Sequence, residues 1–313
     1  MAHAIVFTHV GPPEVLRLVE IPDPTAGPGE VVVQLTAVGV NPRDVKVRSG
    51  VRPLPPSDEP HRLGLDAAGI ITAVGEGVTG FAVGDRVAVR DTFGSYASAL
   101  AVGVRDVALL PAGVSDALGA SLGIPAGTAY QVLRSLNVQP DDVLLVHAGS
   151  GAVGQALIQF AVAEGVTVVA TASLARHERL RTLGAIPVTY GEGLEQRLRD
   201  AAPAPFTVAV DAAGTDEAIA ASLALVPDRE RIATIVRGPD AADFGIRAFS
   251  GGSPHPLTDE EEQLRADALP RALALIADGR FSVELGPELP LADAAEAHRL
   301  VEANTPGKII LRP

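Results

Sequence analysis

The sequence predicts an α/β protein with two domains, a β-rich first domain and a second domain built on a doubly wound parallel sheet. Short runs of β-forming residues, separated by Gly, Pro and Asp, fill the chain up to about residue 115. From about Asp116, strand-like runs alternate with helix-like runs. The 313 residues are enough for two domains with a core each. We expect a first domain at 1–118, completed by 256–313, and a second domain at 119–255.

The first domain is expected to be a small β barrel or sandwich. Its predicted strands lie at 3–9, 16–21, 30–40, 64–74, 85–91 and 96–110. Helix-like segments rich in Ala and Leu follow at 116–122 and 126–136.

The second domain contains six segments with the pattern of buried strands. They lie at 143–147, 167–172, 186–190, 206–212, 231–236 and 244–249. Helical material separates most of them, and six strands form a dinucleotide-binding sheet. Beyond them, Thr258 is a candidate cap for an amphipathic helix to about Asp278, the segment 290–302 predicts a helix, and 308–312 predicts a final strand.

Composition excludes several classes of protein. The 25 Lys and Arg against 38 Asp and Glu give a formal charge of −13, which repels nucleic acid and anionic membrane surfaces. The apolar stretch 143–172 contains His, Gln and Glu, so we expect no membrane span. Residues 1–10 carry no targeting pattern, and we expect a cytoplasmic protein. The absence of Cys excludes disulfides, thiolate zinc sites and a cysteine nucleophile.

A glycine motif follows the first strand of the second domain. It reads Gly149-Ser150-Gly151-Ala152-Val153-Gly154, directly after the apolar run 143–146 and directly before the helical pattern 155–164. In that setting the first glycine permits a tight turn, the second lets backbone N–H groups approach a pyrophosphate, and the third lets the helix pack on the sheet. We interpret these residues as cofactor-binding.

The end of the next strand predicts which dinucleotide binds. An NAD site usually has an acid about twenty residues beyond the first glycine, and here no acid precedes Glu178. Ser173 can hydrogen-bond a 2′-phosphate and Arg176 can pair with it, so we predict NADPH over NADH. The alternative for Arg176 is a solvated charge at the start of a helix.

Several motifs along the chain resemble those of the medium-chain dehydrogenase/reductase superfamily, most closely its zinc-independent quinone oxidoreductase branch. Besides the glycine motif they are GVNPRDVKVRSG at 39–50, GLDAAG at 64–69, VGDRV at 83–87, PAGTAY at 125–130, LGA at 183–185 and GKIIL at 307–311. The resemblance implies a GroES-like substrate domain beside a Rossmann domain, an active site in the cleft between them, and a homodimer.

The metal-binding residues of the family are missing from this chain. In zinc-dependent relatives the position of Asn41 carries a cysteine and that of Leu65 a histidine. The seven histidines of this chain are scattered, with no pair at the spacing of helical metal ligands. We therefore expect no metal site and no alcohol oxidation by zinc.

Chemistry without a metal suits hydride delivery to an electron-poor acceptor, a quinone or an α,β-unsaturated carbonyl. Asn41 resembles the family residue that faces nicotinamide and substrate, and its amide is our candidate catalytic donor to the oxygen that gains charge. A compatible alternative is that Asn41 caps a helix with Pro42 in its first turn and Asp44 three residues on. For Lys46 and Arg48 we favour surface positions.

The remaining predicted cofactor contacts are carried over from the family motifs. They are Thr128 on the nicotinamide side, Tyr190 near the adenosine phosphate, Ala213, Gly214 and Val236 at the carboxyl ends of strands, Gly251 in a loop, and Lys308. Simple packing is the alternative for Tyr190 and a surface position the alternative for Lys308.

The predicted function is zinc-independent hydride transfer from NADPH to a quinone or enone. Two alternatives remain at this point: an NADPH-binding sensor or structural protein without significant turnover, and a tailoring enoyl reductase.

Overall fold

The structure of the chain is a computed structural model that describes residues 1–54, 57, 59–249 and 255–313. Its internal contacts divide the chain into two compact units. The first consists of Met1–Ile124 and Leu269–Pro313, and the second of Pro125–Ala268.

The first unit is built on two largely antiparallel sheets. Among the described residues, one sheet has the order β2-β1-β4 and the other the order β15-β16-β3-β5-β6-β8, with β7 also paired to β3. The strands are β1 (Ala2–Phe7), β2 (Arg17–Ile21), β3 (Glu30–Gly39), β4 (His61–Arg62), β5 (Asp66–Val74), β6 (Arg86–Val89), β7 (Ala99–Gly103), β8 (Val107–Leu109), β15 (Leu285–Pro290) and β16 (Lys308–Arg312).

Strand β16 joins the chain's last segment to this sheet. It pairs antiparallel with the end of β3, with Ile310 opposite Gly39 and Leu311 opposite Val38. The apolar residues of both strands are buried in the core of the unit. Lys308, the first residue of β16, is thereby placed near the residues that follow β3.

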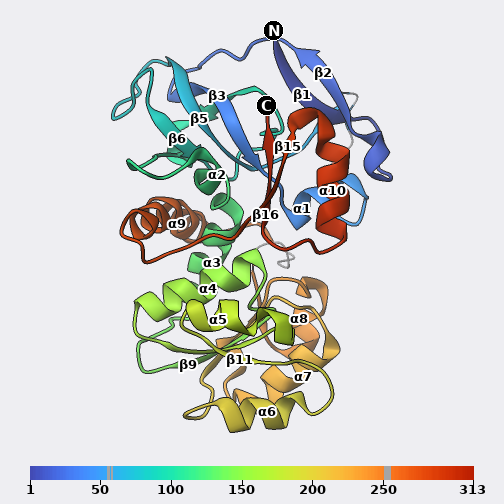
Figure 1. The fold of residues 1–313 in the computed structure, drawn as a ribbon, viewed down its shortest axis with the longest axis vertical. Helices are drawn as coiled ribbons and strands as arrows, with labels where there is room; N and C mark the ends of the chain where they lie inside the picture. Colours follow the sequence, from blue (N-terminus) through green and yellow to red (C-terminus); the bar gives the residue numbers. More distant parts are fainter. Residues whose placement is uncertain (55–56, 58, 250–254) are drawn as a thin grey trace. The chain divides into compact units, whose positions relative to one another are not determined.

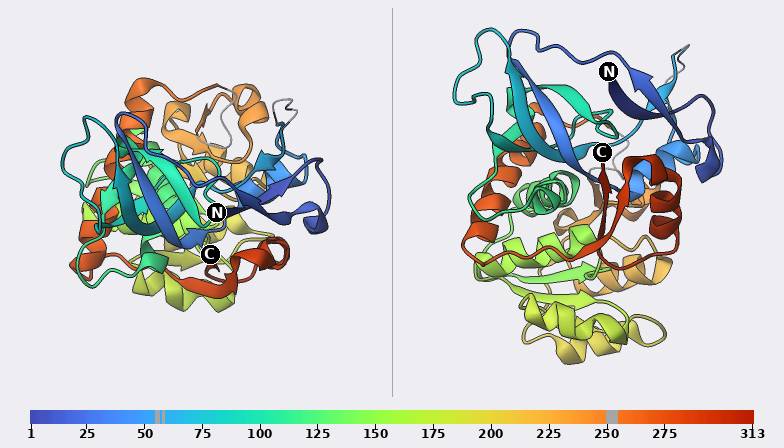
Figure 2. Two further views of the ribbon diagram at one scale, coloured as in Figure 1. Left: turned by 90° about the horizontal axis from the view of Figure 1, so that it is seen from above. Right: turned by 45° about the horizontal axis from the view of Figure 1, so that its top comes forward.

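Six short helices accompany the sheets of the first unit within the described residues. They are η1 (Pro13–Val15), α1 (Pro42–Arg48), η2 (Val104–Asp106), α2 (Asp116–Gly119), η6 (Leu291–Asp293) and α10 (Ala294–Glu302). Helix α10 packs against α1 and η1 (Figures 1 and 2). It presents the buried side chains of Ala294, Ala297 and His298 on one face, as expected of an amphipathic helix.

The second unit is a parallel sheet with helices between its strands. Among the described residues the order is β11-β10-β9-β12-β13-β14, and all neighbours are parallel, which confirms the doubly wound prediction. The strands are β9 (Val143–His147), β10 (Thr167–Thr171), β11 (Ile186–Val188), β12 (Val208–Asp211), β13 (Ile232–Thr234) and β14 (Arg247–Ala248). The helical segments that lie within this unit are α4 (Ala152–Ala163), η3 (Leu174–Arg176), α5 (His177–Thr182), α6 (Leu194–Ala201), α7 (Asp216–Leu225), η4 (Arg229–Arg231) and α8 (Gly238–Phe244). Two further helices, α3 (Gly123–Ser135) and α9 (Asp259–Ala277), are divided between the units, because the boundaries fall after Ile124 and after Ala268.

Three differences between the predicted and the observed elements have physical reasons. The run 96–110 is divided by η2, because β7 pairs with β3 whereas β8 pairs with β6. The start of the predicted strand 244–249 is the end of α8, which stops at Gly245 with a φ of 67°. Strand β15 escaped prediction because Gly286, Pro287 and Pro290 weaken the strand pattern, and such residues are tolerated at a sheet edge.

The predicted capping of the long helix is confirmed. Thr258 Oγ1 accepts from the Glu261 N–H at 3.2 Å, and the Glu261 carboxylate accepts from the Thr258 N–H at 2.8 Å. None of the helices in the described residues has the length and apolar composition needed to cross a membrane.

Candidate active site

The glycine motif forms a turn between β9 and α4 in the second unit. Ala148 takes a positive φ of 56°, which a residue with a Cβ rarely adopts. The turn is held by the end of β10: the Ala148 N–H donates to Thr171 Oγ1 at 3.1 Å, and the Gly149 N–H donates to the Thr171 carbonyl at 2.8 Å. Residues 149–154 are therefore brought to the carboxyl end of the sheet, as the sequence predicts.

The space around two of the glycines indicates different roles. A Cβ on Gly154 would lie 2.4 Å from the Ala148 carbonyl oxygen, so Gly154 permits the helix to approach the turn. A Cβ on Gly151 would have no neighbour closer than that same oxygen at 3.5 Å, and Gly151 is exposed. Gly151 therefore leaves open the approach to the end of α4.

The N-terminus of α4 has the chemistry of an anion site. The first hydrogen bond of the helix is donated by the Gln155 N–H to the Gly151 carbonyl. By helix geometry, the N–H groups of residues 152–154 have no acceptor within the helix, and the helix dipole favours negative charge there. This exposed turn fits a pyrophosphate.

A second turn at the same edge of the sheet is organised by Asp211, the last residue of β12. Its Oδ1 accepts from the N–H groups of Ala213 and Gly214, each at 2.9 Å, and its Oδ2 accepts from the Thr234 hydroxyl at 2.8 Å. Thr234 Oγ1 in turn accepts from the Val236 N–H at 3.1 Å. The structure thus brings together the predicted residues Ala213, Gly214 and Val236.

His147, the last residue of β9, is a buried imidazole at this edge. Its Nδ1 lies 3.4 Å from Thr171 Oγ1, and its Nε2 has no hydrogen-bond partner among the described residues. Burial lowers the pKa of His147 to about 4, although the Asp211 carboxylate acts in the opposite direction. His147 is therefore neutral near pH 7.

The predicted adenosine-phosphate residues lie on adjacent strand ends. Thr171 on β10 is opposite Val188 on β11, and Ser173 and Tyr190 each follow two residues later. Arg176 is partly buried at the end of η3, whereas Tyr190 is exposed. The register therefore brings Ser173 and Tyr190 to corresponding positions, while their contact with a cofactor stays a prediction.

Thr128 lies on α3, and its hydroxyl accepts a hydrogen bond from Arg265 of α9 at 3.2 Å. Both side chains are buried, and no sequence pattern predicted a role for Arg265. The predicted residue Gly251 lies outside the described residues.

In the first unit, Asn41 follows β3 and immediately precedes α1. Its Oδ1 accepts from Lys308 Nζ at 2.5 Å and its Nδ2 donates to Asp66 Oδ2 at 2.9 Å. The backbone N–H of Asn41 donates to the Asp44 carboxylate at 2.9 Å, so the helix begins at the predicted position with Asn41 as its first flanking residue and Asp44 as the side chain that caps it. Lys308 is buried rather than at the surface, and its predicted contact with the cofactor stays a prediction.

A second buried network continues from Asp44. The Tyr96 hydroxyl lies 3.2 Å from Asp44 Oδ2 and 3.2 Å from His298 Nε2. Burial raises the pKa of Asp44 to about 6, opposed by the Asn41 N–H and the Lys308 charge. Burial, together with the charge of Arg48, lowers the pKa of His298 to about 3. At neutral pH, His298 is therefore an uncharged imidazole.

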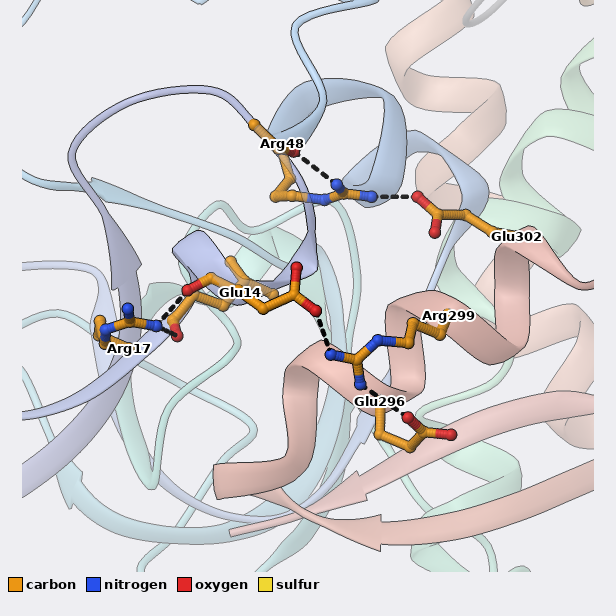
Figure 3. Close-up of polar contacts among 8 residues, drawn as sticks. Glu14, Arg17, Arg48, Glu296, Arg299 and Glu302 are labelled. Carbon is orange, nitrogen blue, oxygen red and sulfur yellow. Dashed lines mark hydrogen bonds and ion pairs between the residues drawn. The ribbon is translucent and has the colours of Figure 1, made fainter.

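Two arginines connect helix α10, which carries His298, to neighbouring segments of the first unit (Figure 3). Arg48 donates to the Gly11 carbonyl at 2.5 Å and pairs with Glu302, and Arg299 bridges Glu14 and Glu296. The expected surface position is wrong for Arg48, which is buried, and agrees with the exposed side chain of Lys46.

The structure therefore groups the predicted residues in two sets. The second unit holds the glycine turn, Thr128, Ser173, Arg176, Tyr190, Ala213, Gly214 and Val236, and the first unit holds Asn41 and Lys308. Sequence reasoning missed Asp66, Tyr96, Asp211, Thr234 and Arg265 as residues that hold these groups in place.

Two protein families match parts of the chain. Residues 27–135 match the alcohol dehydrogenase GroES-like domain, and residues 183–311 match the zinc-binding dehydrogenase family. Although the second description names zinc, the described part of this chain has no group of three or more His, Cys, Asp or Glu that could hold a metal ion.

Individual proteins resemble the chain over most or all of its length. Quinone oxidoreductase 1 of Escherichia coli is 31% identical, with 100% of both chains covered. The crystal structure of Escherichia coli quinone oxidoreductase complexed with NADPH superposes with a TM-score of 0.82 and 28% identity, covering 99% of this chain and 100% of that one. The pikromycin polyketide synthase component PikAII of Streptomyces venezuelae is 34% identical over 93% of this chain, which spans 8% of the length of that protein.

Proposed function

We propose that this chain, which belongs to the quinone oxidoreductase branch of the medium-chain dehydrogenase/reductase superfamily, transfers a hydride from NADPH to a quinone or an α,β-unsaturated carbonyl without a metal ion. The observation that carries the proposal is the exposed turn of residues 149–154 at the N-terminus of α4, in a chain that resembles quinone oxidoreductases from end to end. One of these relatives is described as complexed with NADPH.

The residues of the second unit fit the dinucleotide. The free N–H groups at the start of α4 would bind the pyrophosphate, and the Asp211 turn would border the ring end of the cofactor at the crevice of the sheet. When bound, NADPH supplies the hydride. The protein's contribution is to hold the dinucleotide in place and to limit access of water.

Selection of NADPH over NADH rests on the end of β10. Thr171, Ala172, Ser173, Leu174, Ala175 and Arg176 include no acid that would accept from a ribose 2′-hydroxyl. The Ser173 hydroxyl and the Arg176 guanidinium would instead bind a 2′-phosphate.

On the acceptor side, Asn41 is the proposed donor. An oxygen that gains negative charge during hydride transfer is stabilised by a fixed N–H donor in a site with little water. The Asn41 carboxamide is buried and is held by Asp66 and Lys308, which are the properties such a donor needs.

The similarity to a polyketide synthase component favours a second candidate function. A tailoring enoyl reductase would reduce the conjugated double bond of a tethered or coenzyme A-bound acyl chain by the same hydride transfer. The two functions differ in the size and attachment of the acceptor.

A spectrophotometric assay tests the proposal. NADPH oxidation is followed with a panel of quinones, 2-alkenals and a 2-enoyl thioester, with NADH in parallel and the protein dialysed against a chelator. We expect turnover with at least one quinone or alkenal and a preference for NADPH. Turnover with the thioester alone would favour the enoyl reductase. NADPH binding without any turnover would favour the sensor or structural protein and refute the enzyme.

A further inference from the structure

The first unit buries an ion pair beside Asn41. The side chains of Lys308 and Asp66 are 4% and 0% exposed, and Lys308 Nζ lies 3.5 Å from Asp66 Oδ2. Burial lowers the pKa of Lys308 and raises the pKa of Asp66, while each charge partly opposes the shift of the other. A buried ion pair stabilises a fold little, or less than apolar side chains would, so its presence calls for another explanation.

The surroundings are shaped for this pair. A Cβ on Gly39 would lie 2.9 Å from Lys308 Cε as well as 2.0 Å from the Ala120 carbonyl oxygen, and a Cβ on Gly123 would lie 2.2 Å from Asp66 Oδ1. The Ile124 N–H donates to Asp66 Oδ1 at 2.9 Å. Small residues and a backbone donor thus fix the position of both charged groups.

Asn41 lies between these two charges. An ammonium can only donate, so it must face Oδ1, and a carboxylate can only accept, so it must face the Nδ2 group. The two contacts, at 2.5 Å and 2.9 Å, agree in assigning one orientation to the carboxamide. The reverse orientation would oppose both charged partners.

This orientation leaves one N–H of Asn41 for another acceptor. Nδ2 carries two hydrogens, and within the described residues its hydrogen-bond acceptor is Asp66. The Lys308 ammonium that donates to the amide oxygen withdraws electron density from the amide nitrogen, which strengthens the remaining N–H as a donor.

We propose that Lys308 is a positioning residue for hydride transfer, which acts by holding the Asn41 carboxamide so that its second N–H donates to the oxygen of the acceptor. Asp66 holds both Lys308 and Asn41. This inference rests on the proposed function, since it requires an acceptor oxygen that gains charge. It differs from a direct contact between Lys308 and the cofactor.

Replacement of the ion pair distinguishes the positioning of Asn41 by Lys308 from a direct contact between Lys308 and the cofactor. Lys308→Met keeps the length of the side chain without its charge, and Lys308→Met with Asp66→Asn avoids an unpaired buried carboxylate. We expect both variants to lower kcat about tenfold to a hundredfold, with the Kd for NADPH within about twofold of wild type. Arg312→Met, on the same strand and paired with the exposed Glu288, is the matched control and should leave kcat unchanged. A large rise in the Kd for NADPH with unchanged kcat would overturn the proposal.

A double-mutant cycle tests whether Lys308 acts through Asn41. In an Asn41→Ala background, Lys308→Met should have no further effect on kcat, because the group it positions is gone. Equal effects of Lys308→Met with and without Asn41 would contradict the proposal.

A spectroscopic measurement is independent of turnover. The chain has three asparagines, at 41, 137 and 304, so a protein labelled with ¹⁵N in its asparagine carboxamides gives three pairs of NH₂ signals. Asn41→Ala assigns the pair of Asn41. We expect that pair to exchange slowly with solvent in wild type and rapidly in Lys308→Met, with the other two pairs unchanged. An unchanged Asn41 pair would refute the positioning role.

A wild type inactive on every acceptor would refute the proposed function, while these signals would still show whether Lys308 fixes Asn41.

Discussion

Lys308 Nζ lies 2.5 Å from Asn41 Oδ1, although 267 positions of sequence separate the two residues. The contact exists because β16 pairs with the end of β3, directly before Asn41. A residue near the end of the chain thereby controls the orientation of the residue that we propose as the acceptor-side donor.

Removal of the Arg176 guanidinium is expected to reduce the preference for NADPH. Arg176→Ala should raise the KM for NADPH about tenfold or more, because a charge-assisted hydrogen bond to phosphate is lost, and should change the KM for NADH little. Arg181→Ala is the control, since Arg181 is an exposed arginine paired with Glu178. Equal effects of Arg176→Ala on both cofactors would contradict the 2′-phosphate assignment.

Two glycine substitutions are expected to separate folding from cofactor binding. Gly151→Ala has space for its Cβ, so the unfolding temperature should be nearly unchanged, while NADPH binding measured by calorimetry should weaken about tenfold. Gly154→Ala places its Cβ 2.4 Å from a carbonyl oxygen and should lower the free energy of unfolding by about 1–3 kcal/mol. Unaltered NADPH binding by Gly151→Ala would show that the pyrophosphate lies elsewhere.

The buried imidazole of His298 should make stability depend on pH. The pKa of His298 is about 3 in the folded chain and 6.5 for an exposed histidine. Between pH 3 and pH 6.5 the unfolded chain therefore binds more protons than the folded chain. The stabilisation is complete above pH 6.5 and is lost as the pH falls toward 3, reaching about 2 kcal/mol of loss at pH 5.

Urea unfolding at pH 7.5 and pH 5 checks this expectation. His298→Gln keeps an N–H donor for the Tyr96 oxygen, whose own hydrogen is donated to Asp44, but does not titrate, so it should lose less stability than wild type on going to pH 5. The raised pKa of Asp44 makes the folded state more stable as the pH falls. This effect is present in both proteins, so to a first approximation it cancels when their stability losses are compared. Parallel losses in the two proteins would mean that His298 is not held uncharged.

The two arginines that clamp α10 should differ in their importance (Figure 3). Arg48→Met removes a buried donor from the Gly11 carbonyl and should lower the free energy of unfolding by about 2 kcal/mol. Arg299→Met removes an exposed pair with Glu14 and should change the unfolding midpoint little. Thermal unfolding of both variants measures the two effects. A larger loss of stability in Arg299→Met than in Arg48→Met would contradict the prediction.

Local patterns account for the elements that the sequence predicted. Strand β9 and the glycine turn were predicted because an apolar run, three glycines and a helical pattern follow each other directly. Strand β16 was also predicted at 308–312, since its apolar run is short and bounded by turn residues.

The features that the sequence did not predict depend on contacts between residues that are distant in sequence. Arginine is usually a surface residue, and the burial of Arg48 depends on two distant partners. Packing of α10 on α1 brings Glu302 near it, and the Gly11 carbonyl accepts from its guanidinium. Asp211 and Thr234 lay within predicted strands, but their hydrogen bond requires that β12 and β13 be neighbours, which periodicity does not reveal.

Single-turnover oxidation of NADPH tests directly whether this chain transfers a hydride without a metal ion. Protein dialysed against a chelator is mixed in a stopped-flow instrument with a quinone or a 2-alkenal, using NADPH or NADPH deuterated at the transferred position. We predict complete oxidation of bound NADPH without added metal, slowed by deuterium because the hydride moves in the observed step. No oxidation with any acceptor, or oxidation only after zinc is restored, would rule out metal-independent hydride transfer.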